Sequence, residues 1–178
     1  GIGAPFPIES APYFGRLQRD ANEAAPIRDH SAMPTLRPPI RTVAAVIADA
    51  SGRVLLVRKR GSTTFIQPGG KREAGEDALA TLARELHEEL GVRLVEGSAV
   101  RLGEFEADAV NEPGRRVRGE AFAVRVTGTP AAQAEIAELA WIDPMAPFPV
   151  PVAPLSAEHI LPAWRAFAGR GFFPMRGE

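Results

Sequence analysis

Three glutamates recur at spacings of three and four residues in the segment 77–90: Glu85, Glu88 and Glu89. If this segment is an α-helix, residues three or four apart share one face, and the three carboxylates point to one region of space. Like charges at that spacing repel, and the helix dipole disfavours negative charge in the C-terminal half. Arg84 compensates only part of this charge. The pattern therefore indicates either a bound cation or a solvated acidic face.

A divalent metal ion suits such a cluster, because Mg²⁺ typically binds a few carboxylates together with substrate phosphates. The cluster borders a stripe of leucines at helical spacing, so it faces the body of the protein. Gly69-Gly70 lies just upstream, and adjacent glycines permit close backbone approach. They could bring a backbone carbonyl or amide to the same ion or to a phosphate, or they could form an ordinary turn. The leucines of the stripe are Leu79, Leu82, Leu86 and Leu90.

The elements that must position these residues follow from hydrophobic patterning and turn residues. Strands and helices are mixed without a regular βαβ alternation, which favours an α/β fold with a mixed sheet and helices on its faces. The helix 77–90 ends at Gly91. We expect a β-hairpin from 43–48 and 53–57, an extended piece at 65–67, strands at 102–105, 117–126 and 138–142, and a final helix at 156–168 with Pro162 in its first turn or at a kink.

Composition narrows the class of protein. The chain has 178 residues with a net charge of −1, which gives no global attraction to nucleic acid or to an anionic membrane. Cysteine is absent, which excludes disulfides, thiol nucleophiles and Cys-ligated metals. No apolar run reaches the roughly 20 residues of a membrane span. We expect a cytoplasmic protein with a proline-rich extension over 1–39, one domain over 40–170 and a tail over 171–178. The extension could pack on its own domain or on a second subunit, or could be a free tail.

A known signature runs through the acidic segment. From Gly70 the chain reads glycine, five residues, Glu76, seven residues, then Arg84-Glu85-Leu86, one residue, Glu88-Glu89, one residue and Gly91-Val92. This resembles the Nudix box, G-x5-E-x7-R-E-U-x-E-E-x-G-U with U aliphatic, at every fixed position. The box covers residues 70–92, and the expected strands over about 41–143 also resemble the family's order.

The resemblance implies a Nudix-type α/β/α sandwich with a mixed β-sheet. It implies a pyrophosphohydrolase that uses Mg²⁺ or Mn²⁺ to cleave a diphosphate linkage in a nucleoside diphosphate joined to another moiety. By match of position, Glu85, Glu88 and Glu89 would hold the metal with the carbonyl of Gly69. Arg84 would orient the glutamates. By the same match Glu76 would have a supporting role, although the helical projection does not place it on the metal-facing arc.

The general base is not fixed by the resemblance, because it varies within the family. It is either Glu85 or a carboxylate outside the box. The outside candidate is Glu120, which shares a face of strand 117–126 with Phe122 and Val124, although the pattern slightly favours a solvated charge near a strand end. Glu112 and Glu135 are weaker alternatives.

Basic residues outside the box are candidates for substrate binding. Two basic groups, Arg58-Lys59-Arg60 and Arg115, Arg116 and Arg118, could bind substrate phosphates or could be solvated. We expect a small nucleotide-type substrate, no nucleic-acid partner, no membrane and a possible homodimer. The missing cysteine excludes the related isopentenyl diphosphate isomerases. The alternative function is a non-catalytic Nudix-like nucleotide-binding or regulatory module, which an intact box disfavours.

Overall fold

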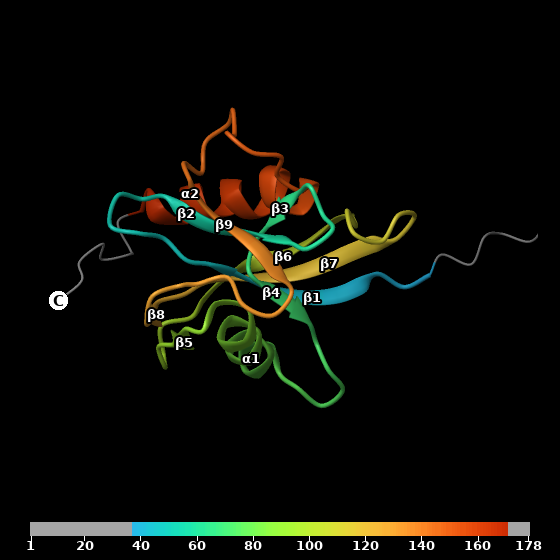
Figure 1. Ribbon diagram of the computed structural model, residues 1–178, viewed down its shortest axis with the longest axis horizontal. Coiled ribbons are helices and arrows are strands. Elements are labelled where there is room, and N and C mark those ends of the chain that lie inside the picture. The colour runs from blue at the N-terminus through green and yellow to red at the C-terminus, as the bar shows by residue number, and fades with distance from the viewer. Residues whose placement is uncertain (1–36, 171–178) are drawn as a thin grey trace, which may run out of the picture. The chain divides into compact units, whose positions relative to one another are not determined.

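The computed structural model describes residues 37–170, and the expected extension and tail lie almost wholly outside them. The described chain is a mixed α/β fold, which confirms the expected class (Figure 1). Its elements in chain order are β1 (Ile40–Val46), β2 (Val54–Lys59), β3 (Phe65–Ile66), β4 (Gly69–Lys71), α1 (Ala78–Leu90), β5 (Arg93–Leu94), β6 (Val100–Asp108), β7 (Arg116–Ala123), β8 (Val126–Thr127), β9 (Ile136–Ile142), the π-helical segment η1 (Leu155–Ile160) and α2 (Leu161–Ala168).

Two sheets lie between the helices. The larger has the strand order β4-β1-β7-β6, with β1 and β7 parallel and the other pairs antiparallel. The second has the order β3-β2-β9 and is antiparallel. A short pair, β5 with β8, stands apart from both. Figure 1 shows α1 on one side of these strands and α2 on the other, so the expected sandwich with a mixed sheet is confirmed.

The expected hairpin of the first two long strands is wrong. One isolated bridge, Ala48 with Val54, joins the two segments, and each strand then enters a different sheet. Both strands are apolar on both faces: Val43 and Leu55 pack toward α1, while Val46 and Leu56 pack toward α2. Because the helices cover both faces, the strands carry the continuous apolar runs typical of doubly covered sheets.

Helix α1 begins and ends as its sequence predicts. Asp77 caps it by accepting the N–H of Ala80 at 2.7 Å, and Gly91 ends it with a φ of 68°. Leu82, Leu86 and Leu90 are fully buried.

Leu79 is not part of the stripe, since it is 43% exposed. The buried face of α1 is instead rotated toward Thr81 and Glu89, with Glu85 at its edge, so these two glutamates lie nearer the interior than the leucine pattern implied, while Glu88 is exposed.

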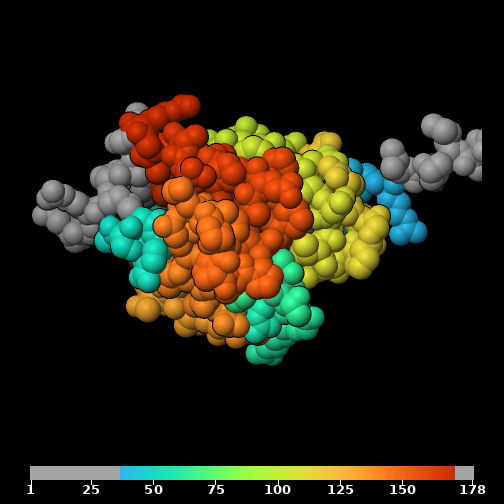
Figure 2. Space-filling model, turned by 90° about the horizontal axis from the view of Figure 1, so that it is seen from above, coloured from blue at the N-terminus to red at the C-terminus, as the bar shows by residue number. Residues whose placement is uncertain are grey.

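The C-terminal helix matches its expected range but not its form. Its first part, η1, is π-helical, and α2 continues from Leu161 with Pro162 in its first turn. Figure 2 shows this segment and the loop before it covering one face of the molecule. Ile160, Leu161 and Trp164 are buried there. Within the described residues, no helix is long and apolar enough to cross a membrane.

The rotated face of α1 gives a matched pair of stability predictions. Leu86→Ala should lower the free energy of unfolding by about 2–5 kcal/mol, because it leaves a cavity in the core. Leu79→Ala should change it by less than about 1 kcal/mol, because Leu79 is largely exposed. Urea unfolding followed by circular dichroism measures both. Equal losses in the two variants would show that the leucine stripe is buried as a whole.

Candidate active site

The two glycines of β4 lie directly against α1 and β1. A Cβ on Gly69 would lie 2.2 Å from the carbonyl oxygen of Val43 on β1. A Cβ on Gly70 would lie 2.3 Å from the carboxylate of Glu85. Gly69 has no room for a side chain and adopts a φ of 138°, while a side chain at Gly70 would displace the Glu85 carboxylate. The glycines therefore allow the Glu85 carboxylate to rest on the backbone of β4.

Glu89 is a buried carboxylate, with 1% of its surface exposed. Its Oε2 accepts a hydrogen bond from the N–H of Gly69 at 3.0 Å, while its Oε1 has no hydrogen-bond partner. Burial raises the pKa of Glu89 to about 7, against the opposing effects of the Gly69 N–H and of Lys59. A buried carboxylate with one unpaired oxygen is costly unless something else compensates it.

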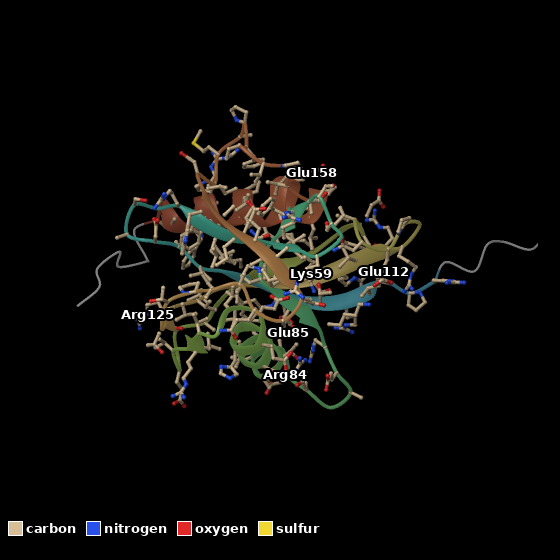
Figure 3. All side chains as sticks on the ribbon, viewed as in Figure 1. Lys59, Arg84, Glu85, Glu112, Arg125 and Glu158 are labelled. Atoms are coloured by element: carbon tan, nitrogen blue, oxygen red, sulfur yellow. The ribbon has the colours of Figure 1, made fainter. Side chains whose placement is uncertain are left out.

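Lys59 approaches this carboxylate from β2. Its Nζ lies 3.5 Å from Glu89 Oε1 and also forms an ion pair with Glu135. Burial alone would lower the pKa of Lys59, but its bonds to Glu135 and Glu89 outweigh that effect and raise it above the ordinary value. Figure 3 shows Lys59 and Glu85 lying near each other where β4 meets α1. Of the Arg58-Lys59-Arg60 group, Lys59 is thus the member that reaches the glutamates.

Arg84 connects the remaining box glutamates. Its Nε and Nη2 each donate to one oxygen of Glu76 at 2.9 Å, and its Nη1 donates to Glu85 Oε1 at 2.8 Å. Glu88 lies 3.7 Å from the same Nη1. The bidentate bond from Arg84 lowers the pKa of Glu76 to about 2. These charge-assisted hydrogen bonds fix the positions of the Glu76 and Glu85 carboxylates relative to Arg84.

The carboxylates are held by cations of the protein rather than gathered around one point. Among residues 37–170, no three acidic or histidine side chains are arranged as a ready metal site. Glu85 and Glu88 lie against Arg84, whereas Glu89 lies between Gly69 and Lys59. A shared ion would require Glu88 to turn away from Arg84. The donor set, hard oxygens with one buried oxygen unpaired, fits a divalent cation.

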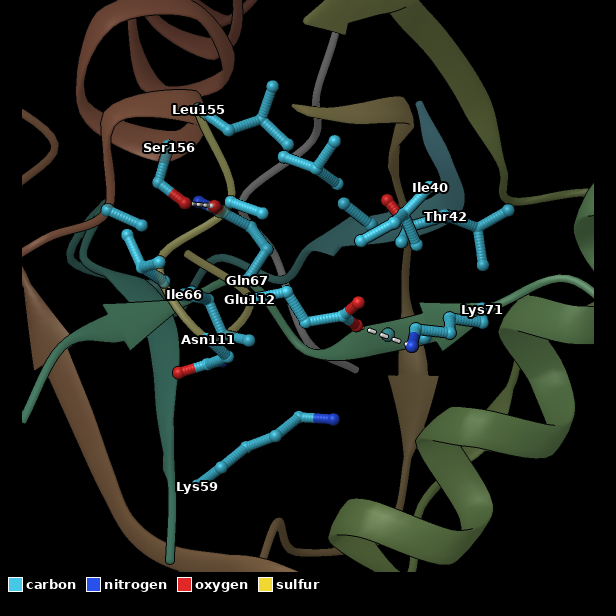
Figure 4. A pocket seen from close by; sticks show the side chains of 18 of the residues that line it. Ile40, Thr42, Lys59, Ile66, Gln67, Lys71, Asn111, Glu112, Leu155 and Ser156 are labelled. Carbon is cyan, nitrogen blue, oxygen red and sulfur yellow. Dashed lines mark hydrogen bonds and ion pairs between the residues drawn. The ribbon is translucent and has the colours of Figure 1, made fainter. Parts of the chain in front are cut away.

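A cavity of about 430 Å³ opens beside Glu85 and the glycines of β4 (Figure 4). Charged groups surround one part of it, and Lys71 bonds to Glu112 across it at 2.6 Å. Apolar side chains form the rest of the wall. The charged lining residues include Lys59, Lys71, Glu85, Glu112 and Glu135; the apolar ones include Ile40, Ile66, Val117, Leu155 and Ile160.

The candidate bases are distributed unevenly about this cavity. Glu85, Glu112 and Glu135 line it. Glu120 is not among the lining residues, and its carboxylate accepts a bond from Arg101 on β6 at 2.6 Å. Glu120 shares its face of β7 with buried Phe122, as expected, but Arg101 supplies the partner that the sequence did not reveal.

Several polar cavity residues were not identified from the sequence, among them Gln67, Lys71 and Ser156. Lys71 directly follows the first glycine of the box, and this position is the one signal that could have marked it. Gln67 and Ser156 carry no such signal, because a single polar residue beside a proline or in a helix is ordinarily exposed. Within residues 37–170, no ion pair joins the second basic group to the box glutamates. Arg116 and Arg118 pair with Glu106 across β6 and β7, and Arg115 lies 3.9 Å from the cavity residue Glu112.

Comparison with known proteins decides the family. A family model of the NUDIX domain matches residues 38–163. The chain belongs to the Nudix family. A search of curated proteins gave no match.

Solved Nudix structures agree with this assignment. The solution structure of the Escherichia coli ORF135 protein is 30% identical with a TM-score of 0.60, and the match covers 74% of this chain and 91% of that one. A MutT Nudix hydrolase from Burkholderia pseudomallei is 22% identical with a TM-score of 0.59, covering 70% and 99%. A UDP-X diphosphatase is 20% identical with a TM-score of 0.62, covering 75% of this chain and 65% of that one. As a Nudix protein with an intact box, the chain is an enzyme, a pyrophosphohydrolase.

The bond between Arg84 and Glu76 predicts a pH-dependent stability. The pKa of Glu76 is about 2 in the folded chain and near 4.5 when unperturbed, so its contribution is present above pH 4.5 and is lost as the pH falls toward 2. Glu76→Gln should therefore be less stable than wild type at pH 7, with the difference shrinking between pH 4.5 and 2. Urea unfolding at several pH values measures this. A difference independent of pH would contradict it, and Glu96→Gln, on an exposed residue, is the control.

Proposed function

We propose that this Nudix enzyme hydrolyses a diphosphate linkage in a nucleoside diphosphate joined to another moiety, and that it depends on Mg²⁺ or Mn²⁺. The observation that carries the proposal is the buried Glu89 carboxylate, whose Oε1 accepts no hydrogen bond and lies 3.5 Å from Lys59, on the same helix as Glu85 at the charged end of a cavity. A divalent cation would give this oxygen a direct bond, which a lysine at 3.5 Å does not. One structural neighbour is a UDP-X diphosphatase, and its name describes a substrate of this class.

The metal would be held by Glu85, Glu88 and Glu89, with the carbonyl of Gly69 as a further donor. All three carboxylates come from α1, and Gly69 already touches Glu89 through its N–H. When bound, the cation supplies neutralisation of the negative charge on the diphosphate and Lewis-acid activation of the reaction. Selectivity for a hard divalent ion follows from the all-oxygen donor set.

Glu85 is the residue best placed to act as general base. Its side chain lines the cavity, and Arg84 holds one of its oxygens, which fixes the direction of the carboxylate. It would accept a proton from the attacking water as the bond between a phosphorus and its bridging oxygen breaks. Glu120 is less favoured, because it lies outside the cavity lining and is paired with Arg101.

The cations of the cavity would bind the phosphates. Lys59 and Lys71 both line its charged part, and each is engaged with a carboxylate. Phosphate oxygens attract ammonium groups as point charges. With the diphosphate held at this end, the apolar part of the wall remains for the rest of the substrate.

Removal of the proposed base gives the first activity prediction. Glu85→Gln keeps the shape of the side chain but cannot accept a proton, so kcat should fall by about 10²- to 10⁴-fold. Glu96→Gln, on an exposed residue away from the box, should retain wild-type rates. Chromatography of the nucleotides formed from nucleoside triphosphates, dinucleotides and nucleotide sugars with Mg²⁺ or Mn²⁺ measures both. Wild-type rates in Glu85→Gln would exclude it as the base, and no hydrolysis of any compound by the wild type would favour the binding-module alternative.

A further inference from the structure

Gln67 is a buried side chain with half of its amide unpaired. It lies between β3 and β4, and only 4% of its surface is exposed. Its Oε1 accepts a hydrogen bond from the hydroxyl of Ser156, a residue of η1 that is itself 2% exposed. Its Nε2 has no hydrogen-bond partner. The amide is therefore fixed at one end and unsatisfied at the other.

The unpaired group belongs to the wall of the active-site cavity. Gln67 and Ser156 both line the cavity, and Figure 4 shows them joined across it at the end away from Lys59. Their neighbours in the wall are apolar, among them Ile66, Leu155 and Ile160. This part of the cavity thus offers apolar contact together with one pair of linked polar side chains.

A structural role for Gln67 explains only half of this arrangement. The bond from Ser156 needs the carbonyl oxygen alone, and a buried N–H₂ without an acceptor destabilises the folded protein. Turning the amide over would let Nε2 donate to the same hydroxyl, but it would leave the carbonyl unpaired instead. An apolar side chain would fill the site without that cost. The amide becomes fully paired when a ligand with a hydrogen-bond acceptor occupies the cavity.

We propose that Gln67 is a specificity-determining residue whose Nε2 donates a hydrogen bond to a carbonyl oxygen or ring nitrogen of the substrate's nucleobase, and that Ser156 is the residue that positions it. This rests on the proposed function, in which the substrate is a nucleotide. A planar base fits an apolar wall, and its edge carries the acceptors that an amide can bind. Lys59 and Lys71 mark the opposite, phosphate-binding end of the same cavity.

Pairing a protein change with a substrate change tests this assignment. For the best nucleotide substrate, each acceptor atom of the base is replaced in turn, for example guanosine by 7-deazaguanosine. One replacement should lower the wild-type kcat/KM by about 10- to 100-fold, because it leaves Nε2 unpaired in the complex. The same replacement should lower kcat/KM of Gln67→Met by less than about threefold. Equal losses in both proteins for every replacement would overturn the proposal.

Three further variants sharpen the test. An ionised glutamate at position 67 has only acceptors. Gln67→Glu should therefore hydrolyse the nucleotide with the preferred base more slowly than Gln67→Met does, and a faster rate would overturn the donor assignment. Ser156→Ala should weaken the discrimination without abolishing turnover. Gln133→Met, on an exposed glutamine, should discriminate as wild type does. Because Gln67→Met leaves the Ser156 hydroxyl unpaired, the double variant Gln67→Met/Ser156→Ala provides a form with neither polar partner.

Binding without turnover separates this proposal from the proposed function. The same substrate pairs, as nucleoside monophosphates, are titrated calorimetrically into wild type and Gln67→Met in the presence of EDTA. If replacing one base atom weakens binding to wild type but not to Gln67→Met, and no triphosphate is hydrolysed, the base-binding role of Gln67 is supported and the proposed reaction is rejected. If a triphosphate is hydrolysed but every replacement affects the two proteins equally, the proposed reaction is supported and the role of Gln67 is rejected.

Discussion

The structure depends on placing mutually repelling carboxylates against two glycines, Gly69 and Gly70, which have no side chains to keep the carboxylates away from the backbone of β4. Glu85 rests on Gly70, and Glu89 is buried with one oxygen on the N–H of Gly69. Buried carboxylates need cations or donors around them. Lys59 reaches Glu89 from β2, and Arg84 binds Glu85 and Glu76 from within the box. These contacts offset the repulsion between the α1 glutamates, which would destabilise the isolated helix.

The fold serves this arrangement by bringing distant segments to one edge. Strand β4 pairs only with β1 in the larger sheet, so its other side is open to α1 and to the cavity. Strand β2 belongs to the second sheet and supplies Lys59 from a different direction. The segment η1 closes the apolar end of the cavity with Leu155 and Ser156. One cavity thereby combines a charged end with an apolar end. A nucleotide is divided in the same way, into charged phosphates and a largely apolar base.

Local patterns predicted the helix and the identity of the box, because spacing within one helix determines which residues share a face. They failed where tertiary packing decides. Leu79 fits the leucine stripe but is exposed, since the helix is rotated so that Glu89 is buried instead. The strand β4 was not expected, because its two glycines resemble a turn; their small size is needed for contact with Val43 and Glu85.

Contacts between residues far apart in the chain also could not be predicted from sequence patterns. Gln67 and Ser156 are 89 positions apart, and nothing in either segment signals that they meet. Lys59 stands between two arginines with the same local pattern, and only the register of β2 selects it. Glu120 was reasonable as a base from its apolar neighbours, but the sequence did not show that β6 places Arg101 beside it.

The central claim is that the α1 carboxylates bind a divalent cation, and direct Mn²⁺ binding tests it most closely. Electron paramagnetic resonance of metal-free protein titrated with Mn²⁺ gives the affinity without any substrate. Wild type and Glu96→Gln should bind alike, while Glu89→Gln should bind on the order of 10- to 100-fold more weakly, because it loses a buried ligand. Equal Mn²⁺ affinity in Glu89→Gln and wild type, or no binding to either, would contradict the claim.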